Sequence, residues 1–252
     1  MVNRVNTHFL PQWLEPRNLA GSTVVVIDIL RASTTIISAL AAGARTVHPC
    51  REVAEAVHIA AQLEPAVVLG GERDGLRIEG FQLGNSPTEY TTEVVGGKNI
   101  VFTTTNGTLA MESCREADRI LIGAFANQSV VVEALATQPQ VDLVCAGTNG
   151  EVTREDVLFA GAVVARLSRS RIVMNDASRL AWDAWCHLES ASPEVLTKTL
   201  QDSQGGRNLV KIGHGVDIAH AAQMDTTNLL PELDVRNWQI HRGRGVADGE
   251  SQ

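Results

Sequence analysis

The sequence predicts an α/β fold, in which helices cover a largely parallel or mixed β-sheet. Short β-branched runs alternate with helical patterns along most of the chain, as they do in strand–helix–strand units. The 252 residues suffice for a large core, and neither a linker nor a repeat of about 20–50 residues divides them. We therefore expect a single domain over residues 1–252, with a C-terminal helical subregion at 176–230.

The individual elements follow from periodicity and from turn residues. Strands are expected at 23–27, 46–49, 66–69, 100–104, 119–122 and 141–146, with an extended segment and loop over 1–20. Helices are expected at 34–42, 52–63, 109 onward, 127–136 and 153–169, the last opening on a Thr153–Asp156 capping box. Residues 76–87 indicate a strand and a glycine-punctuated loop. Beyond residue 176 we expect helices at 176–188, 193–204 and 217–224, a polar loop at 201–215 and a polar tail.

Composition excludes several classes of function. The net charge is −8 and the chain has only three lysines and no basic run, so we expect no nucleic-acid partner. No apolar run approaches the roughly 20 residues that span a bilayer, and the amino terminus lacks a signal-peptide core. The four cysteines have no C-x-x-C spacing, which indicates free thiols. We expect a cytoplasmic protein without a membrane partner, and a homo-oligomer is compatible with the sequence.

A threonine-rich turn follows the central expected strand. Residues 103–108 read T-T-T-N-G-T and lead into a helical pattern, so unpaired backbone N–H groups and a positive helix dipole would suit an anion there. A simple Thr/Asn helix cap is the alternative. Thr148-Asn149-Gly150 repeats the turn after the strand at 141–146. This repetition predicts that the two turns serve one site.

Four expected strands carry polar residues just beyond their carboxyl ends, where open α/β sheets bind ligands. The combination of carboxylates, arginines and hydroxyls suits a divalent cation beside a phosphate-like anion. The residues are Asp28, Arg31, Ser33 and Thr34 after the first strand, Gly70, Gly71, Glu72, Arg73 and Asp74 after the second, 103–108 after the third, and 148–151 after the fourth. Each residue also has a structural alternative. Asp28 could cap a helix, Arg31 could pair with Glu72 or Asp28, and Glu79 could lie on a solvated face.

Common nucleophile and nucleotide motifs are absent from the sequence. There is no G-x-x-x-x-G-K-[ST] loop, no G-x-G-x-x-G after a strand, no G-x-S-x-G elbow and no H-E-x-x-H pair. Cys145 lacks the arginine of a cysteine phosphatase, and Leu30 stands where an aspartyl-phosphate enzyme has its second Asp. Metal-assisted attack by water, or attack by Asp28, remains.

Several segments carry a family resemblance. They are V-V-V-I-D-I-L-R-A-S-T-T (24–35), L-G-G-E-R (69–73), I-E-G-F-Q-L-G-N-S-P (78–87), T-T-T-N-G-T (103–108), L-I-G-A-F-A-N (121–127) and V-C-A-G-T-N-G (144–150). With looser matches at 205–213 and 217–222, the chain resembles the 2-phosphosulfolactate phosphatase family over about residues 20–230. Ser33 departs from the family's usual threonine and preserves the hydroxyl. The resemblance implies a Mg²⁺-dependent phosphatase that forms 3-sulfolactate on a coenzyme M route.

Roles for single residues follow from the resemblance and the expected site. Mg²⁺ would bind Asp28 and Glu72, with Glu79 as a third ligand. Asp28, Arg31 and Asn106 would be catalytic, and Arg73 and Arg207 would bind the substrate's carboxylate and sulfonate. The wider set expected to bind the substrate or its phosphate is Ser33, Thr34, Arg73, Asn85, Ser86, Thr104, Thr105, Gly107, Thr108, Thr148, Asn149, Gly150 and Arg207.

Three other functions remain open. A phosphatase of the same mechanism could accept a different small 2-phospho acid, because a fold does not determine its substrate. A binding protein could recognise a phospho-acid without turning it over. A lyase or transferase would need a proton-abstracting base, and the scarcity of lysine argues against a Schiff base.

Overall fold

The computed structural model describes residues 4–63, 66–167, 173–188 and 192–243. Within this part of the chain, eleven strands form one sheet in the order β5-β4-β6-β3-β11-β10-β7-β2-β8-β1-β9. Their bounds are β1 Arg4–His8, β2 Thr23–Ile27, β3 Thr46–Cys50, β4 Val67–Arg73, β5 Leu76–Arg77, β6 Asn99–Thr103, β7 Arg119–Gly123, β8 Gln140–Cys145, β9 Val173–Met174, β10 Leu230–Asp234 and β11 Gln239–Gly243.

The sheet is mixed, and its two parallel parts are joined by antiparallel strands. One parallel part consists of β7, β2, β8, β1 and β9, and the other of β3, β6 and β4. The pairs β4–β5, β10–β11, β7–β10 and β3–β11 are antiparallel. The α/β class and the mixed sheet predicted from the sequence are therefore confirmed.

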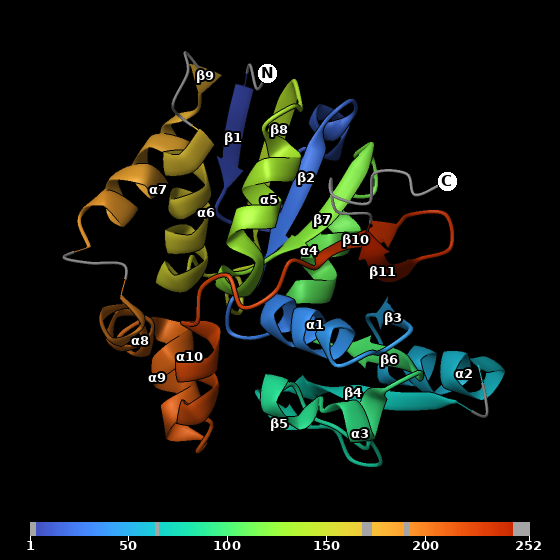
Figure 1. Ribbon diagram of the computed structural model, residues 1–252. Coiled ribbons are helices and arrows are strands. Elements are labelled where there is room, and N and C mark those ends of the chain that lie inside the picture. The colour runs from blue at the N-terminus through green and yellow to red at the C-terminus, as the bar shows by residue number, and fades with distance from the viewer. Residues whose placement is uncertain (1–3, 64–65, 168–172, 189–191, 244–252) are drawn as a thin grey trace, which may run out of the picture.

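Helices cover both faces of the sheet (Figure 1). They are α1 Ala32–Ala41, α2 Val53–Leu63, α3 Thr92–Val95, α4 Gly107–Ser113, α5 Gln128–Leu135, α6 Arg154–Leu167, α7 Asp176–Cys186, α8 Pro193–Gln201, α9 Gln204–Lys211 and α10 Gly215–Ala221. The expected helix at 153–169 matches α6, and residues 168 and 169 lie outside the described residues. In the described part of the chain, no helix combines the length and apolarity needed to cross a membrane.

Strand β2 lies at the centre of the larger parallel part, and both of its faces are buried. Val25 and Ile27 pack in one hydrophobic cluster with α5 and α6, whereas Val24 and Val26 pack in a second cluster with α1 and α4. This is the arrangement expected of a strand with helices on both sides. The helices α8, α9 and α10 contribute to the first cluster, and the division of the chain into domains stays a prediction.

The predicted polar tail is wrong, because residues 230–243 form the hairpin β10–β11. Leu233 pairs with Ile120 of β7, and Ile240 pairs with Val47 of β3, so the hairpin joins the two parallel parts. Leu233 and Ile240 are buried. The apolar residues are few and interspersed with charged ones, so the local pattern alone did not indicate strands.

The predicted loop at 201–215 is also wrong, because α9 occupies most of it. Ser203 begins this helix and its Oγ accepts the N–H of Gly206 at 3.0 Å, as an N-cap serine does. The two glycines serve packing rather than flexibility. A Cβ on Gly205 would lie 2.1 Å from Glu155 Oε1, and one on Gly206 would lie 2.0 Å from the Leu200 carbonyl oxygen.

The capping box predicted at the start of α6 is not formed. Asp156 Oδ1 accepts the N–H of Ile29 at 2.9 Å, and Oδ2 accepts the N–H of Gly147 at 3.0 Å. The carboxylate thus ties the loop after β2 to the turn after β8. The sequence has the spacing of a capping box, but the Asp156 carboxylate accepts its hydrogen bonds from two other segments.

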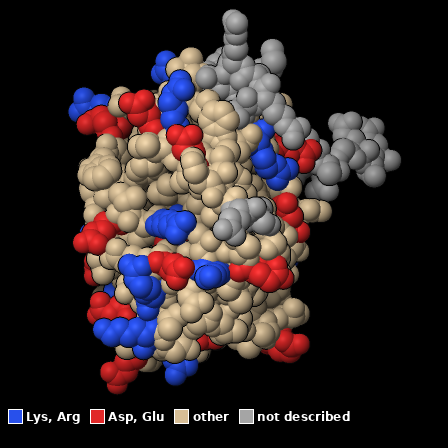
Figure 2. Space-filling view, turned by 90° about the vertical axis from the view of Figure 1, so that its left-hand side faces the viewer, with Lys and Arg blue, Asp and Glu red and all other residues tan. Residues whose placement is uncertain are grey.

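The surface near α7 and α8 carries charges of both signs. Figure 2 shows acidic and basic side chains interspersed on this face, with uncharged surface between them. This mixture agrees with a net charge that is spread along the sequence.

Candidate active site

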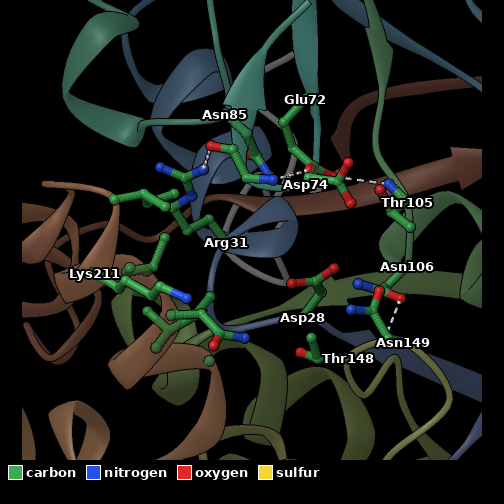
Figure 3. Close-up of a pocket in the computed structure, with 16 residues that line it drawn as sticks. Asp28, Arg31, Glu72, Asp74, Asn85, Thr105, Asn106, Thr148, Asn149 and Lys211 are labelled. Carbon is green, nitrogen blue, oxygen red and sulfur yellow. Dashed lines mark hydrogen bonds between the residues drawn. The ribbon is translucent and has the colours of Figure 1, made fainter.

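The carboxyl ends of four strands, two from each parallel part of the sheet, line one cavity of about 270 Å³ (Figure 3). The segments after β2, β4, β6 and β8 contribute to it, and α9 supplies a further wall. The convergence of the four strand ends, on which the sequence argument depended, is confirmed. Whether a ligand binds there stays a prediction.

The two T-N-G turns lie against each other at this cavity. Asn106 Oδ1 accepts the backbone N–H of Asn149 at 3.1 Å, so the repeated turn is linked directly to the first. Thr105 in turn donates its backbone N–H to Glu72 Oε1 at 2.9 Å. Three of the four strand ends are therefore connected by hydrogen bonds that hold their polar side chains around one space.

Asp28 lies at the base of the cavity, and only 7% of it is exposed. Its Oδ1 accepts the N–H of Ala32 at 3.1 Å, so one oxygen caps α1 as the alternative reading expected. Its Oδ2 faces Gly107, where a Cβ would come within 2.8 Å. Glycine at position 107 thus permits α4 to approach the carboxylate. The main chain of Asp28 is held by Ser33, whose Oγ accepts the Asp28 N–H at 3.0 Å.

The electrostatic environment of Asp28 disfavours its ionised form. Burial, with the charges of Glu72 and Glu155, raises the pKa of Asp28 to about 7, although the hydrogen bond from Ala32 and the charge of Arg31 act to lower it. A nearby cation would stabilise the ionised form of this carboxylate, because it would offset both the cost of burial and the repulsion from the other acids.

Two further buried acids, Glu155 and Asp156, lie close to Asp28, and the sequence did not assign either of them to the site. Burial and the charges of Glu155 and Asp28 raise the pKa of Asp156 well above its ordinary value. Burial likewise raises the pKa of Glu155, and its Oε2 has no hydrogen-bond partner among the described residues. In the sequence they resemble ordinary acids in the first turn of a helix.

Arg31 is buried, and its partner is not one that the sequence suggested. Its Nη1 lies 2.7 Å from Asp217 Oδ2, and its Nη2 donates to the Gly75 carbonyl oxygen at 2.8 Å. Asp217 also accepts the Ser86 hydroxyl at 2.6 Å, and His214 Nδ1 lies 3.4 Å from it. This network fixes the guanidinium at the cavity wall.

Glu72 and Asn85 complete the oxygen-rich side of the cavity. Besides the bond from Thr105, Glu72 accepts the Gly75 N–H at 2.7 Å. Asn85 is 6% exposed, and its Oδ1 has no hydrogen-bond partner among the described residues. A buried carbonyl oxygen without a partner in a cavity wall is available to a ligand or a cation.

Known proteins resemble this chain closely. The family model described as 2-phosphosulpholactate phosphatase matches residues 8–235. The chain belongs to the 2-phosphosulfolactate phosphatase family.

Relatives in this family extend over most of both chains. A protein of Thermotoga petrophila is 39% identical over 211 residues, which are 84% of this chain and 88% of the relative. One of Pseudothermotoga lettingae is 36% identical over 227 residues, 90% and 94% of the two chains. One of Symbiobacterium thermophilum is 39% identical over 217 residues, 84% and 91%. Each carries the name "Probable 2-phosphosulfolactate phosphatase". Family membership makes the chain an enzyme, a phosphoric monoester hydrolase.

Many of the residues predicted for this phosphatase site line the cavity, and several do not. Those at the cavity are Asp28, Arg31, Glu72, Asn85, Thr105, Asn106, Thr148 and Asn149. Those outside its lining are Ser33, Thr34, Arg73, Glu79, Ser86, Thr104, Gly107, Thr108, Gly150 and Arg207. The roles of both groups stay predictions.

The residues outside the lining have visible partners. Thr34 donates its hydroxyl to the Ile29 carbonyl at 2.8 Å, and the hydroxyls of Thr104 and Thr108 lie 3.4 Å apart. Arg73 donates to the Glu72 carbonyl oxygen and to Thr103 Oγ1. These side chains shape the segments that carry the site.

Arg207, predicted to bind the substrate, and Glu79, predicted to bind the metal, lie on the surface. Arg207 is exposed and donates to the carbonyl oxygen of Asp202, and Glu79 is exposed. Neither lines the cavity. Both residues lie in segments that match the family, but this proximity in the sequence did not bring their side chains to the cavity.

Asp74 lines the cavity, as its place among the polar residues after the second strand predicted, although it was given no specific role. Seven further lining residues were not predicted, and they are Leu30, Gly75, Gly205, Asn208, Leu209, Lys211 and Ile212. Four of these come from α9 and Ile212 is its C-cap residue, and positions 205, 208, 209 and 212 repeat at the helical period. That spacing was the signal in the sequence, and the glycines at 205 and 206 obscured it.

Proposed function

We propose that this phosphatase hydrolyses the phosphate ester of 2-phospho-3-sulfolactate to 3-sulfolactate and inorganic phosphate in a Mg²⁺-dependent reaction of the coenzyme M biosynthesis type. The observation that carries the proposal is the gathering of Asp28, Glu72 and Arg31 at one cavity in a chain of the 2-phosphosulfolactate phosphatase family. The names of the relatives supply the substrate, and the cavity supplies groups that suit it.

Arg31 is the group best suited to the phosphoryl oxygens. Its contacts with Asp217 and Gly75 occupy part of the guanidinium's five N–H donors, which leaves others for a ligand. A planar, permanently charged donor fixed by a buried partner can bind a phosphoryl group in a bidentate manner. Thr105 and Asn106 lie across the cavity and can donate to the same group.

The oxygen donors suit a Mg²⁺ ion that keeps much of its water. Within the described residues, no group of three or more His, Cys, Asp or Glu side chains is arranged to hold a metal. Mg²⁺ requires only one or two carboxylates, with waters and substrate oxygens completing its shell. Asp28 and Glu72 would hold the ion, with the unpartnered Asn85 Oδ1 available nearby. When bound, Mg²⁺ would neutralise charge on the phosphoryl group and favour attack upon it.

Phosphate release tests the proposal directly. The purified protein would be incubated with 2-phospho-3-sulfolactate, 2-phospholactate and 2-phosphoglycerate, each with Mg²⁺ and with EDTA. We expect release from 2-phospho-3-sulfolactate that requires Mg²⁺. Equal release with EDTA would contradict the role of the metal. Binding without release would indicate a binding protein, and faster release from another acid would indicate a different substrate.

A further inference from the structure

The cavity lining includes a second positively charged side chain, Lys211, to which the family comparison assigns no role. Among its described lining residues, the only Lys or Arg side chains are Arg31 and Lys211. A 2-phospho-3-sulfolactate molecule carries a carboxylate and a sulfonate besides its phosphoryl group, so one fixed arginine leaves further negative charge to balance. Arg73 and Arg207, the two residues expected to bind these groups, do not line the cavity.

Lys211 has the position and the freedom to meet such a group. It lies in the last turn of α9, and Figure 3 shows its amino group directed into the cavity from the wall opposite Asn106. Among the described residues, no hydrogen bond or salt bridge involves this amino group. Asn208, three positions earlier on α9, also lines the cavity, and its amide is a second polar group on this helix.

The two cations suit different anions. Arg31 is 4% exposed and held by Asp217, so it presents a rigid planar donor set near Asp28, where the phosphoryl group must lie for reaction. Lys211 is exposed and carries a compact charge on a flexible stem. A sulfonate is fully ionised at neutral pH and spreads its charge over three equivalent oxygens, so it needs a positive charge rather than a planar fork.

We propose that Lys211, supported by the Asn208 amide, forms the subsite that binds the sulfonate of the substrate. This inference rests on the proposed function, because it assumes that the phosphoryl group lies at Asp28 and Arg31. The sulfomethyl arm then extends from the reacting centre toward α9. Lys211 is a specificity-determining residue and leaves the chemical step to the residues at the strand ends.

Substrate discrimination in a Lys211→Met variant tests the subsite. We expect kcat/KM for 2-phospho-3-sulfolactate to fall about 10–100-fold, mainly through KM, which is the range for losing a charge-assisted contact. For 2-phospholactate, which lacks the sulfonate, kcat/KM should change less than about twofold. Lys211→Arg should restore much of the preference, because it retains the charge.

Lys198→Met is the matched control. Lys198 is also exposed and lies in the last turn of the neighbouring helix α8, but it does not line the cavity. Its replacement removes the same charge from a similar helix end, and we expect both substrates to keep their wild-type kcat/KM. An equal loss for both substrates in Lys211→Met, or no loss for either, would overturn the subsite.

Binding of the product separates this inference from the proposed function. Calorimetric titration with 3-sulfolactate and with lactate requires no turnover, so it reports on the subsite even if the wild type releases no phosphate. We expect the wild type to prefer 3-sulfolactate and Lys211→Met to lose that preference. Equal affinities of the wild type for the two acids would refute the subsite, whereas a retained preference without phosphate release would refute only the proposed function.

Discussion

Asp28 divides its two carboxylate oxygens between structure and chemistry. Oδ1 accepts the Ala32 N–H at 3.1 Å, while Oδ2 faces Gly107 at the cavity. An amide can retain the first contact through its own oxygen but cannot supply a negative charge. This makes asparagine the informative replacement, because it tests the charge while it preserves the cap.

We therefore expect Asp28→Asn to lower kcat for phosphate release by about 10²–10³-fold or more, with little change in thermal stability. Steady-state kinetics and a melting curve would check this. Ser113→Ala, on the far end of α4 from the cavity, loses one hydroxyl contact to Leu109 and should keep its kcat. Full turnover by Asp28→Asn would remove Asp28 from the mechanism.

A second buried acid, Asp142, has the opposite balance of forces. Burial alone would raise its pKa, but hydrogen bonds from His8, Asn6 and Gln140 hold the pKa below its ordinary value of 3.8. The folded state therefore favours the ionised form more than the unfolded chain does. Its stabilising contribution is present above about pH 4 and is lost as the pH falls through the lowered pKa.

Asp142→Asn should thus lower the free energy of unfolding by about 1–3 kcal/mol at pH 7, and by less at pH 3. Urea titrations of both proteins at pH 7, 5 and 3 would measure the difference. A difference that grows toward low pH would show that the sign is wrong. Because Asp142 does not line the cavity, kcat at pH 7 should be unaffected in the folded fraction.

At the scale of single elements, α9 shows how a glycine can serve packing. Gly205 lies against Glu155, which is buried, so an added methyl group would displace either the helix or the acid. Gly205→Ala should destabilise the protein by about 1–3 kcal/mol and raise KM, because α9 forms a cavity wall. Chemical denaturation and steady-state kinetics would measure both effects.

Gly215→Ala provides the comparison. A Cβ at Gly215 would meet only Val210 Cγ2 at 3.9 Å, an ordinary contact, and the residue begins α10. Alanine there should be neutral or stabilising by up to about 1 kcal/mol. If the two alanines had the same effect, the close approach of α9 to Glu155 would not be the reason for Gly205.

The hairpin β10–β11 is the element that the sequence analysis missed most completely. Ile240 is fully buried and pairs with Val47 of β3. Ile240→Ala should lower the free energy of unfolding by about 2–5 kcal/mol, measured by urea denaturation. His241→Ala, at the exposed neighbouring position, should cost less than about 0.5 kcal/mol. A small loss in Ile240→Ala would argue against a hairpin that supports both parts of the sheet.

At the scale of the whole molecule, the site depends on segments that are far apart in the chain. Asp28, Glu72 and Asn106 come from three different strand ends, and Arg31 is held by Asp217. A ligand that binds several of these segments stabilises the folded state as a whole, by an amount set by its concentration relative to its dissociation constant.

Mg²⁺ together with phosphate should therefore raise the melting temperature by about 5–10 °C near 100 times the dissociation constant, and EDTA should reverse the shift. Differential scanning fluorimetry would measure it. Asp28→Asn should abolish the shift. Glu79→Gln separates the two predicted ligand sets: a retained shift would restrict the metal to Asp28 and Glu72, and a lost shift would restore Glu79 as a ligand.

The sequence by itself determined the α/β class, the strands of both parallel parts except β9, and the four polar strand ends. It could do so because these features are local: β-branched runs predict strands, and the polar residues directly follow those runs in the sequence. Parallel pairing brings strand ends to one edge only within each parallel part, so the meeting of the two parts was decided by the tertiary structure. The T-N-G repeat predicted that the two turns lie at one site, and in the structure Asn106 and Asn149 are joined by a hydrogen bond.

Only the tertiary structure decided which side chains meet. Arg31 is separated from Asp217 by 186 positions, and the hairpin at 230–243 finds its partners in strands over a hundred residues earlier. No periodicity records such pairings, because they depend on packing between distant segments. The same reason applies to Lys211 and to Glu155, which look like ordinary surface and helix-start residues until α9 closes over the cavity.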